Sequence, residues 1–191
     1  MSRPPGLRLA WARVPDGMPR RDASRGLLRR LAPDVRFTRR CPTCGSADHG
    51  PLRADGDAFL ASVTYAGGLA IVGVVDADAS GGTASLGIDA EPEADPRREA
   101  AGMRGVLGDG TATVRAWTRV EAALKADGRG LRVEPATVVV TEEPDGAGWV
   151  AVVPGGLRYR GWDVIGPEGV VLSAAFALTG AAGDGAGRSS R

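Results

Sequence analysis

The clearest helical pattern in the chain covers residues 117–125, where apolar residues recur at the spacing of one helix face: Val120, Ala123 and Leu124. A neighbouring side carries three residues at four-residue intervals: Trp117, Glu121 and Lys125. An acid and a base therefore lie one turn apart on the same side of the predicted helix. Gly128 and Gly130 follow and are expected to end it.

The remaining pattern predicts one more helix and a series of short strands. The second helix covers residues 20–31, with Leu27, Leu28 and Leu31 as its buried stripe. Alternating or continuous apolar runs predict strands at residues 7–14, 58–66, 69–75, 83–91, 137–141, 149–153, 156–165 and 170–178. Residues 70–75 are apolar throughout and should form a fully buried strand, paired with residues 58–66 across a turn at Gly67 and Gly68.

The chain divides near the glycine-containing turn at residues 76–82. With 191 residues it has room for two small halves that share a core, which we place at residues 1–80 and 81–179. Residues 92–109 are polar and interrupted by proline, with a short helix expected at residues 97–107. The Gly-, Ala- and Ser-rich residues 180–191 are expected to be a disordered tail.

Composition excludes several classes of function. The net charge is +1, so no global field favours nucleic acid or an anionic membrane surface. No apolar run approaches the roughly 20 residues of a membrane-spanning helix, and no apolar signal segment is present at the N-terminus. The two cysteines do not indicate a disulfide framework. We therefore expect a cytoplasmic protein with no nucleic-acid or membrane partner.

Candidate chemistry begins with two carboxylates in the predicted strand at residues 83–91. Asp89 and Glu91 project to one side of the strand while Ile88 and Ala90 project to the other. Carboxylates held this close repel each other unless a cation intervenes, and Mg²⁺ is the natural partner for such oxygen ligands. The alternative is an ordinary acidic strand end at the surface.

The strand and the helix together suggest a magnesium and phosphate site. Asp89, Glu91 and Glu121 would hold the ion, and Lys125 would reach the phosphates of a diphosphate donor. Lys125 is the only lysine in the chain, and every other basic residue of the lysine or arginine type is an arginine. The alternative for Lys125 is an exposed helix-surface pair with Glu121.

Two further segments leave alternatives open. The helix at residues 20–31 carries five arginines that form either a solvated face or a phosphate-binding patch: Arg20, Arg21, Arg25, Arg29 and Arg30. Cys41, Cys44 and His49 suggest zinc, but a closed structural site needs a fourth ligand, which would have to be the adjacent Asp48. Otherwise the segment is a turn with reduced thiols.

The ordered set of motifs resembles the 4'-phosphopantetheinyl transferases, in particular the surfactin-synthetase-activating type. Residues 87–91 (Gly-Ile-Asp-Ala-Glu) and 117–125 (Trp-Thr-Arg-Val-Glu-Ala-Ala-Leu-Lys) are similar to the paired signature of that family. Residues 22–28, 41–51 and 62–67 resemble, in family order, its early helix, its cysteine-and-glycine loop and its serine-histidine strand end.

The resemblance implies an α+β fold of two pseudo-twofold-related α/β halves, each a helix packed on a small antiparallel sheet, with coenzyme A between them. It implies transfer of the phosphopantetheine arm of coenzyme A to a serine of an acyl or peptidyl carrier protein, as in secondary metabolism. By position, Asp89, Glu91 and Glu121 would bind Mg²⁺. Glu121 would also deprotonate the carrier serine, directly or through a water, and Lys125 would neutralise the departing phosphate. A single chain holding both halves would suffice as a monomer.

By the same resemblance, coenzyme A would contact Arg25, Thr64 and Tyr65, and the departures from the family pattern fall on this side of the site. Thr64 and Tyr65 replace the usual Ser-His pair, and Pro51 and Leu52 follow Gly50 where a cation is usual, unless Arg53 replaces it. Gly26 stands where a hydroxyl is often found. We interpret this as altered nucleotide binding with the catalytic groups kept. The alternatives are a degenerate paralogue that binds coenzyme A or a carrier protein without transfer, and a zinc-dependent regulator.

Overall fold

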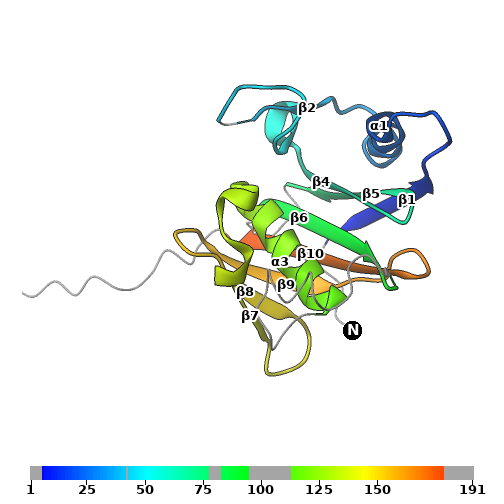
Figure 1. Ribbon diagram of the computed structural model, residues 1–191. Helices are drawn as coiled ribbons and strands as arrows, with labels where there is room; N and C mark the ends of the chain where they lie inside the picture. Colours follow the sequence, from blue (N-terminus) through cyan, green and yellow to red (C-terminus); the bar gives the residue numbers. More distant parts are fainter. Residues whose placement is uncertain (1–5, 42, 78–82, 95–112, 179–191) are drawn as a thin grey trace, which may run out of the picture.

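The computed structural model of the chain describes residues 6–41, 43–77, 83–94 and 113–178 (Figure 1). In this part of the chain the fold is mixed α/β, with α-helices packed on antiparallel sheets. The short helix expected at residues 97–107 and the tail at residues 180–191 lie outside the described residues. No helix among the described residues is both long and apolar enough to cross a membrane.

The smaller sheet has the order β1-β5-β4 and is antiparallel throughout. Its strands are β1 (Arg8–Arg13), β4 (Phe59–Ala66) and β5 (Leu69–Asp76). The central strand β5 is apolar and buried on both faces, as the sequence predicted. Helix α1 (Arg20–Leu31) packs on this sheet through Leu27 and Leu28. A two-stranded sheet of β2 (Phe37–Arg39) and β3 (Leu52–Ala54) was not predicted, because three-residue strands are too short to show a period.

The larger sheet has the order β6-β10-β9-β8-β7. Its strands are β6 (Thr83–Pro92), β7 (Val139–Glu142), β8 (Trp149–Val152), β9 (Arg158–Asp163) and β10 (Val170–Leu178). The predicted strand at residues 137–141 begins later than expected, because Pro135 opens a 3₁₀ turn, η5 (Pro135–Thr137), ahead of it. Two other 3₁₀ turns are η1 (Asp55–Asp57) and η4 (Gly130–Arg132).

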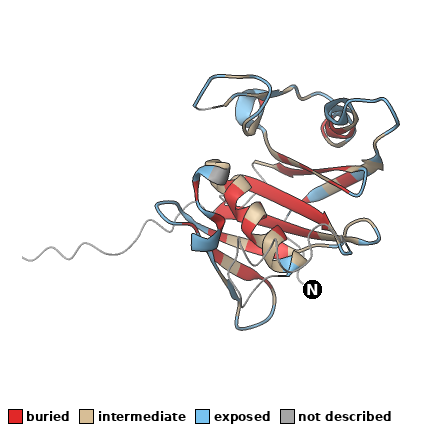
Figure 2. Cartoon of the chain, in the orientation of Figure 1, coloured by how far each residue is buried: buried red, intermediate tan, exposed pale blue. Residues whose placement is uncertain are grey.

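Helix α3 (Val114–Asp127) lies across the β6, β10 and β9 side of the larger sheet (Figure 1). It begins at Thr113, whose hydroxyl accepts from Ala116 N, and ends at Gly128 in the left-handed conformation (φ 80°). The predicted apolar face is confirmed, since Val120, Ala123 and Leu124 are buried. Figure 2 shows this buried seam between the helix and the sheet.

A glycine sets how closely α3 approaches the sheet. A Cβ atom at Gly87 of β6 would lie 2.0 Å from Ala122 O and 2.5 Å from Ala126 N, so the helix backbone rests directly on this strand. Side chains two and four residues further along the same face of β6, at Asp89 and Glu91, then point toward the helix. The close contact therefore positions both predicted carboxylates against α3.

The two sheets meet along β4 and β6, which are edge strands of their respective sheets. Ser62 Oγ of β4 accepts a hydrogen bond from Ile88 N of β6 at 3.0 Å, so the exposed edge of β6 is partly satisfied by a side chain rather than by another strand. A continuous hydrophobic cluster joins both sheets, with Ile71 and Val75 of β5 packed among residues of β6 and β10. Both sheets therefore contribute side chains to this part of the core.

Candidate functional site

The centre of the candidate site is an ion pair between the two predicted motifs. Lys125 Nζ of α3 lies 2.7 Å from Asp89 Oδ1 of β6 and donates a second hydrogen bond to Ile88 O at 3.1 Å. Thr64 Oγ1 of β4 donates to the same Asp89 oxygen at 3.1 Å. Asp89 is 5% exposed, and its carboxylate is held by groups from two other elements, α3 and β4.

The second oxygen of Asp89 has a different environment. Asp89 Oδ2 is buried and accepts no hydrogen bond from the described residues. A buried carboxylate oxygen without a donor is costly, and it is an available ligand for a cation. Asp89 therefore has one oxygen engaged by Lys125 and one free to bind a further group.

The other two predicted metal ligands lie along the same seam. Glu91 is 9% exposed and accepts a hydrogen bond from Trp117 Nε1 of α3 at 3.3 Å. Glu121 lies on α3 one turn before Lys125 and is partly exposed. The oxygens of Asp89, Glu91 and Glu121 do not all lie within 4.8 Å of one another; among the described residues only a cysteine and histidine cluster forms such a group. A shared ion would require these three carboxylates to come closer together.

A cavity of about 760 Å³ opens beside this seam, between β4, β6 and the end of α3. Its lining includes five cationic side chains: Arg39, Arg53, Lys125, Arg129 and Arg132. Among the described residues its one acidic lining residue is Asp127, which is already bound by Arg129 and by the hydroxyl of Tyr159 at 2.8 Å. The cavity is therefore suited to an anionic ligand, and Arg53 lines it as the sequence analysis allowed.

A second cavity of about 650 Å³ lies beside α1 and β2 and is lined by five arginines: Arg21, Arg25, Arg29, Arg36 and Arg39. Burial lowers the pKa of Arg39, and the nearby positive charges of Arg21 and Arg25 lower it further. Three of the arginines predicted as a patch on the helix thus line a cavity. A bound anion would relieve the repulsion between their positive charges. Arg39 contributes to both cavities.

The three predicted coenzyme A contacts are divided between two faces of β4. Thr64 points toward β6 and Asp89, whereas Tyr65, the next residue, points toward α1. Tyr65 Oη lies 3.0 Å from Ser24 Oγ, and the Arg20 guanidinium lies 5.1 Å from the centre of its ring. Arg25 also lies on the α1 side, where it lines the second cavity. Alternation along the strand, which the motif comparison overlooked, explains the division.

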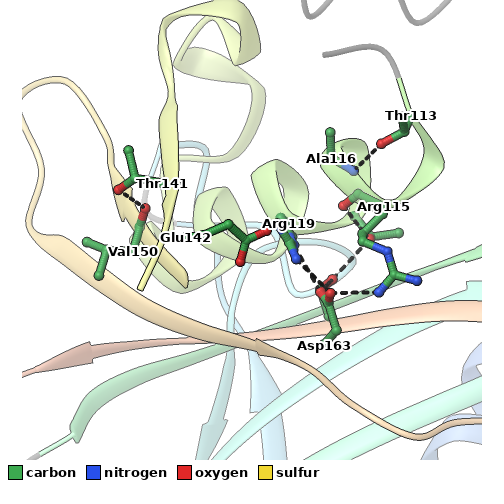
Figure 3. A network of polar contacts seen from close by, with 10 residues as sticks. Thr113, Arg115, Ala116, Arg119, Thr141, Glu142, Val150 and Asp163 are labelled. Carbon is green, nitrogen blue, oxygen red and sulfur yellow. Dashed lines mark hydrogen bonds and ion pairs between the residues drawn. The ribbon is translucent and has the colours of Figure 1, made fainter. Parts of the chain in front are cut away.

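A polar network outside the cavities fixes the position of α3 (Figure 3). Asp163 of β9 receives hydrogen bonds from Arg119 Nε at 3.0 Å, Arg119 Nη2 at 2.8 Å and Arg115 Nη1 at 2.7 Å. Burial alone would raise the pKa of Asp163, but the hydrogen bonds from Arg119 and Arg115 outweigh it and leave the pKa lowered. Ser173 of β10 also donates to Asp163. The sequence analysis missed this network because its partners are far apart in the chain.

The cysteine loop forms one wall of the larger cavity, with Cys41, Cys44 and His49 among the lining residues. Hydrogen bonds from the backbone N–H groups of Cys44 and Thr43 lower the pKa of Cys41 to about 6. The loop is tied to the far side of the cavity by Arg132, whose Nη1 donates to Thr43 Oγ1 at 2.8 Å.

Comparison with protein-family models finds no match to this chain, and comparison with curated proteins finds none either. The residues of the site and their geometry therefore carry the functional proposal.

Proposed function

We propose that the protein is a magnesium-dependent 4'-phosphopantetheinyl transferase, which moves the phosphopantetheine arm of coenzyme A onto a serine of an acyl or peptidyl carrier protein. The contact of 2.7 Å between Lys125 Nζ and Asp89 Oδ1 carries the proposal. It joins the two sequence motifs that resemble the family signature, and it does so beside a cavity lined with cations. We also infer that α1 with the smaller sheet and α3 with the larger sheet are the two related halves of that family's fold.

In this reaction the carrier serine oxygen attacks the phosphorus that bears the pantetheine arm, and the bond from that phosphorus to the bridging oxygen breaks. Adenosine 3',5'-bisphosphate leaves. Glu121 takes the serine proton, directly or through a water, because it lies on the partly exposed side of α3, one turn from Lys125. Lys125 neutralises the charge that develops on the leaving phosphate.

The acidic groups at the seam suit Mg²⁺ by their chemistry. Asp89 offers a buried oxygen with no donor among the described residues, Glu91 contacts Trp117, and Glu121 lies between Trp117 and Lys125 on one side of α3. These three residues would hold the ion. When bound, Mg²⁺ would neutralise the diphosphate and make the phosphorus more open to attack.

The cavities support binding of the nucleotide portion of coenzyme A. Each phosphate of that ligand is an anion, and the two cavities share Arg39 while each contributes further arginines. Arg53 supplies a positive charge next to Pro51 and Leu52, where the family usually has a cation that this chain lacks. The departures at Tyr65 and Pro51 therefore fall where other cations are close by.

One observation favours the alternative, a protein that binds coenzyme A or a carrier protein without transfer. Lys125 occupies Asp89 Oδ1, and the three carboxylates are not gathered within 4.8 Å among the described residues. If ligand binding does not release Lys125 from Asp89, the seam would act as a structural ion pair.

Intact-mass analysis separates the two. Several apo carrier proteins are incubated with the protein, coenzyme A and Mg²⁺, and transfer adds the mass of one phosphopantetheinyl group to the carrier. Glu121→Gln keeps the size of the side chain but removes the base, so it should abolish the gain. Glu134→Gln, a matched change at an exposed glutamate away from both cavities, should leave it intact. Binding of coenzyme A by calorimetry, with no mass gain on any carrier, would favour the binding protein.

A further inference from the structure

The loop at residues 41–50 brings three metal-ligating side chains together. One ligand atom each from Cys41, Cys44 and His49 lies within 4.8 Å of the other two. Cys44 Sγ and His49 Nε2 are 3.3 Å apart. On a tetrahedral zinc ion with ordinary bond lengths, a sulfur and a nitrogen ligand are about 3.6 Å apart. The three groups are therefore close to the spacing of zinc ligands.

The backbone of the loop holds this arrangement in place. Gly45 N donates to Cys41 O at 2.9 Å, and Cys41 N donates to Ser46 O at 2.9 Å, which closes the turn between the cysteines. Gly50, at φ +103°, returns the chain so closely that a Cβ there would lie 2.7 Å from Arg40 O. Little rearrangement would be needed on binding.

Asp48 is not part of the cluster, although the sequence analysis required it as the fourth ligand of a closed site. Its Oδ1 binds Arg21 Nη1 of α1 at 3.0 Å, and its backbone oxygen binds the same guanidinium. Asp48 instead anchors the loop to α1. The three remaining ligands, all of which line the larger cavity, leave a fourth coordination position for solvent.

We propose that Cys41, Cys44 and His49 bind a zinc ion, with water in the fourth position on the cavity side. The two sulfurs bind as thiolates and release their protons to solvent, and the imidazole binds in its neutral form through Nε2. The ion fixes the loop that Arg132 reaches from across the cavity. Zinc thus secures one wall of the anion-binding cavity, whatever reaction takes place there.

The test uses the full chain, purified under reducing conditions and stripped of metal. Titration with Co²⁺ should produce sulfur-to-cobalt charge-transfer absorption together with the ligand-field bands of tetrahedral cobalt, saturating at equimolar metal. Zn²⁺ should then displace the cobalt and abolish both. Addition of equimolar Zn²⁺ should also raise the midpoint of thermal unfolding, because the ion binds only the folded loop.

Variants identify the ligands. Cys44→Ser and His49→Ala should each lose equimolar zinc binding, whereas Asp48→Asn should retain it. Circular dichroism of each variant reports whether the fold is kept. The cobalt spectrum of the wild type tests metal binding even if a variant fails to fold. Absence of sulfur-to-cobalt absorption in the reduced wild type, zinc binding unchanged by Cys44→Ser, or a different metal in excess of zinc after native purification would overturn the proposal. A stable Cys41–Cys44 disulfide that persists under mild reduction would also overturn it.

Discussion

At the scale of single residues, the most consequential contact is the one between Lys125 and Asp89. The Asp89 side chain is 7% exposed and the Lys125 side chain 31%, so the pair is largely shielded from solvent on the acidic side. Removing the lysine would leave a buried carboxylate that, among the described residues, is held by Thr64 alone. Such an unpaired buried charge costs more than the pair itself contributes, because the desolvation penalty remains.

We expect Lys125→Met to lower the free energy of unfolding by roughly 2 to 3 kcal/mol, measured by urea denaturation at neutral pH. The double variant Lys125→Met/Asp89→Asn should recover part of that loss, because the buried negative charge is then gone. If the single and double variants are equally stable, the Asp89 charge does not depend on Lys125 for its stabilisation. Lys125→Arg keeps the charge but not the compact ammonium, so it should retain more stability than transfer activity.

At the scale of elements, the fit of α3 against β6 decides which side chains meet. Gly87 permits this fit because a Cβ would overlap the helix backbone at Ala122. The opposite case is Gly26 inside α1, where an added Cβ meets nothing within 4 Å. The two glycines therefore provide a matched pair for the same substitution.

Gly87→Ala should destabilise the protein by roughly 2 to 3 kcal/mol, since α3 must move away from the strand. It should also reduce the proposed transfer activity, because Lys125 and Glu121 move with the helix. Gly26→Ala should instead stabilise α1 by about 0.5 to 1 kcal/mol, as expected for glycine replaced by alanine inside a helix. Thermal denaturation of both variants tests this, and a stable Gly87→Ala would contradict the close packing.

The Arg119–Asp163 network belongs to the same scale because it ties α3 to β9 and β10. The pKa of Asp163 is lower in the folded protein than its ordinary value. The stability that this group contributes is therefore fully present above the ordinary carboxyl pKa, about 4, and is lost as the pH falls through the lower folded value.

Asp163→Asn should cost roughly 3 kcal/mol at neutral pH, where it leaves two arginines without their shared partner. Measured by urea denaturation from pH 7 downward, the difference from wild type should shrink below about pH 4. Asp16→Asn removes a charge from an exposed position and serves as the control, with little change at any pH. A constant difference across the pH range would contradict the proposed linkage.

At the scale of the whole molecule, the larger cavity is formed by β4 of the smaller sheet, β6 of the larger sheet, the end of α3 and the loops around them. The second cavity is formed by α1 and by the segments that contain β2 and β3. Arg39 of β2 lines both cavities, although the sequence analysis did not single it out. Binding of an anionic ligand in either cavity should therefore depend on this residue. Under the proposed function, that ligand is coenzyme A.

Coenzyme A should stabilise the wild type by about 2.7 kcal/mol when its concentration is a hundred times its dissociation constant. This gain should appear as a higher midpoint of thermal unfolding. Arg39→Gln should weaken coenzyme A binding roughly tenfold or more in calorimetry, as expected for the loss of a hydrogen bond to a charged group. Arg158→Gln, at an exposed arginine of β9 outside both cavities, should bind as wild type does. Equal affinity in all three proteins would place the nucleotide elsewhere.

The sequence by itself determined most of the helices and strands. Helix α1 and the strands β1, β4, β5, β6, β8, β9 and β10 lie where the apolar periodicity placed them within a few residues, and the core face of α3 is the predicted one. The shared side of Asp89 and Glu91 also followed, because alternation along a strand is a local property of the backbone. Local spacing was sufficient for these features.

Only the tertiary structure decided which groups meet. Asp163 as partner of Arg119, Thr64 as donor to Asp89, and Ser24 as the partner of Tyr65 depend on how distant segments pack together. The engagement of Asp48 by Arg21, which leaves Cys41, Cys44 and His49 as a three-ligand set, depends on the seating of the loop against α1. Periodicity records which face of an element is buried, but it carries no information about which other element covers that face.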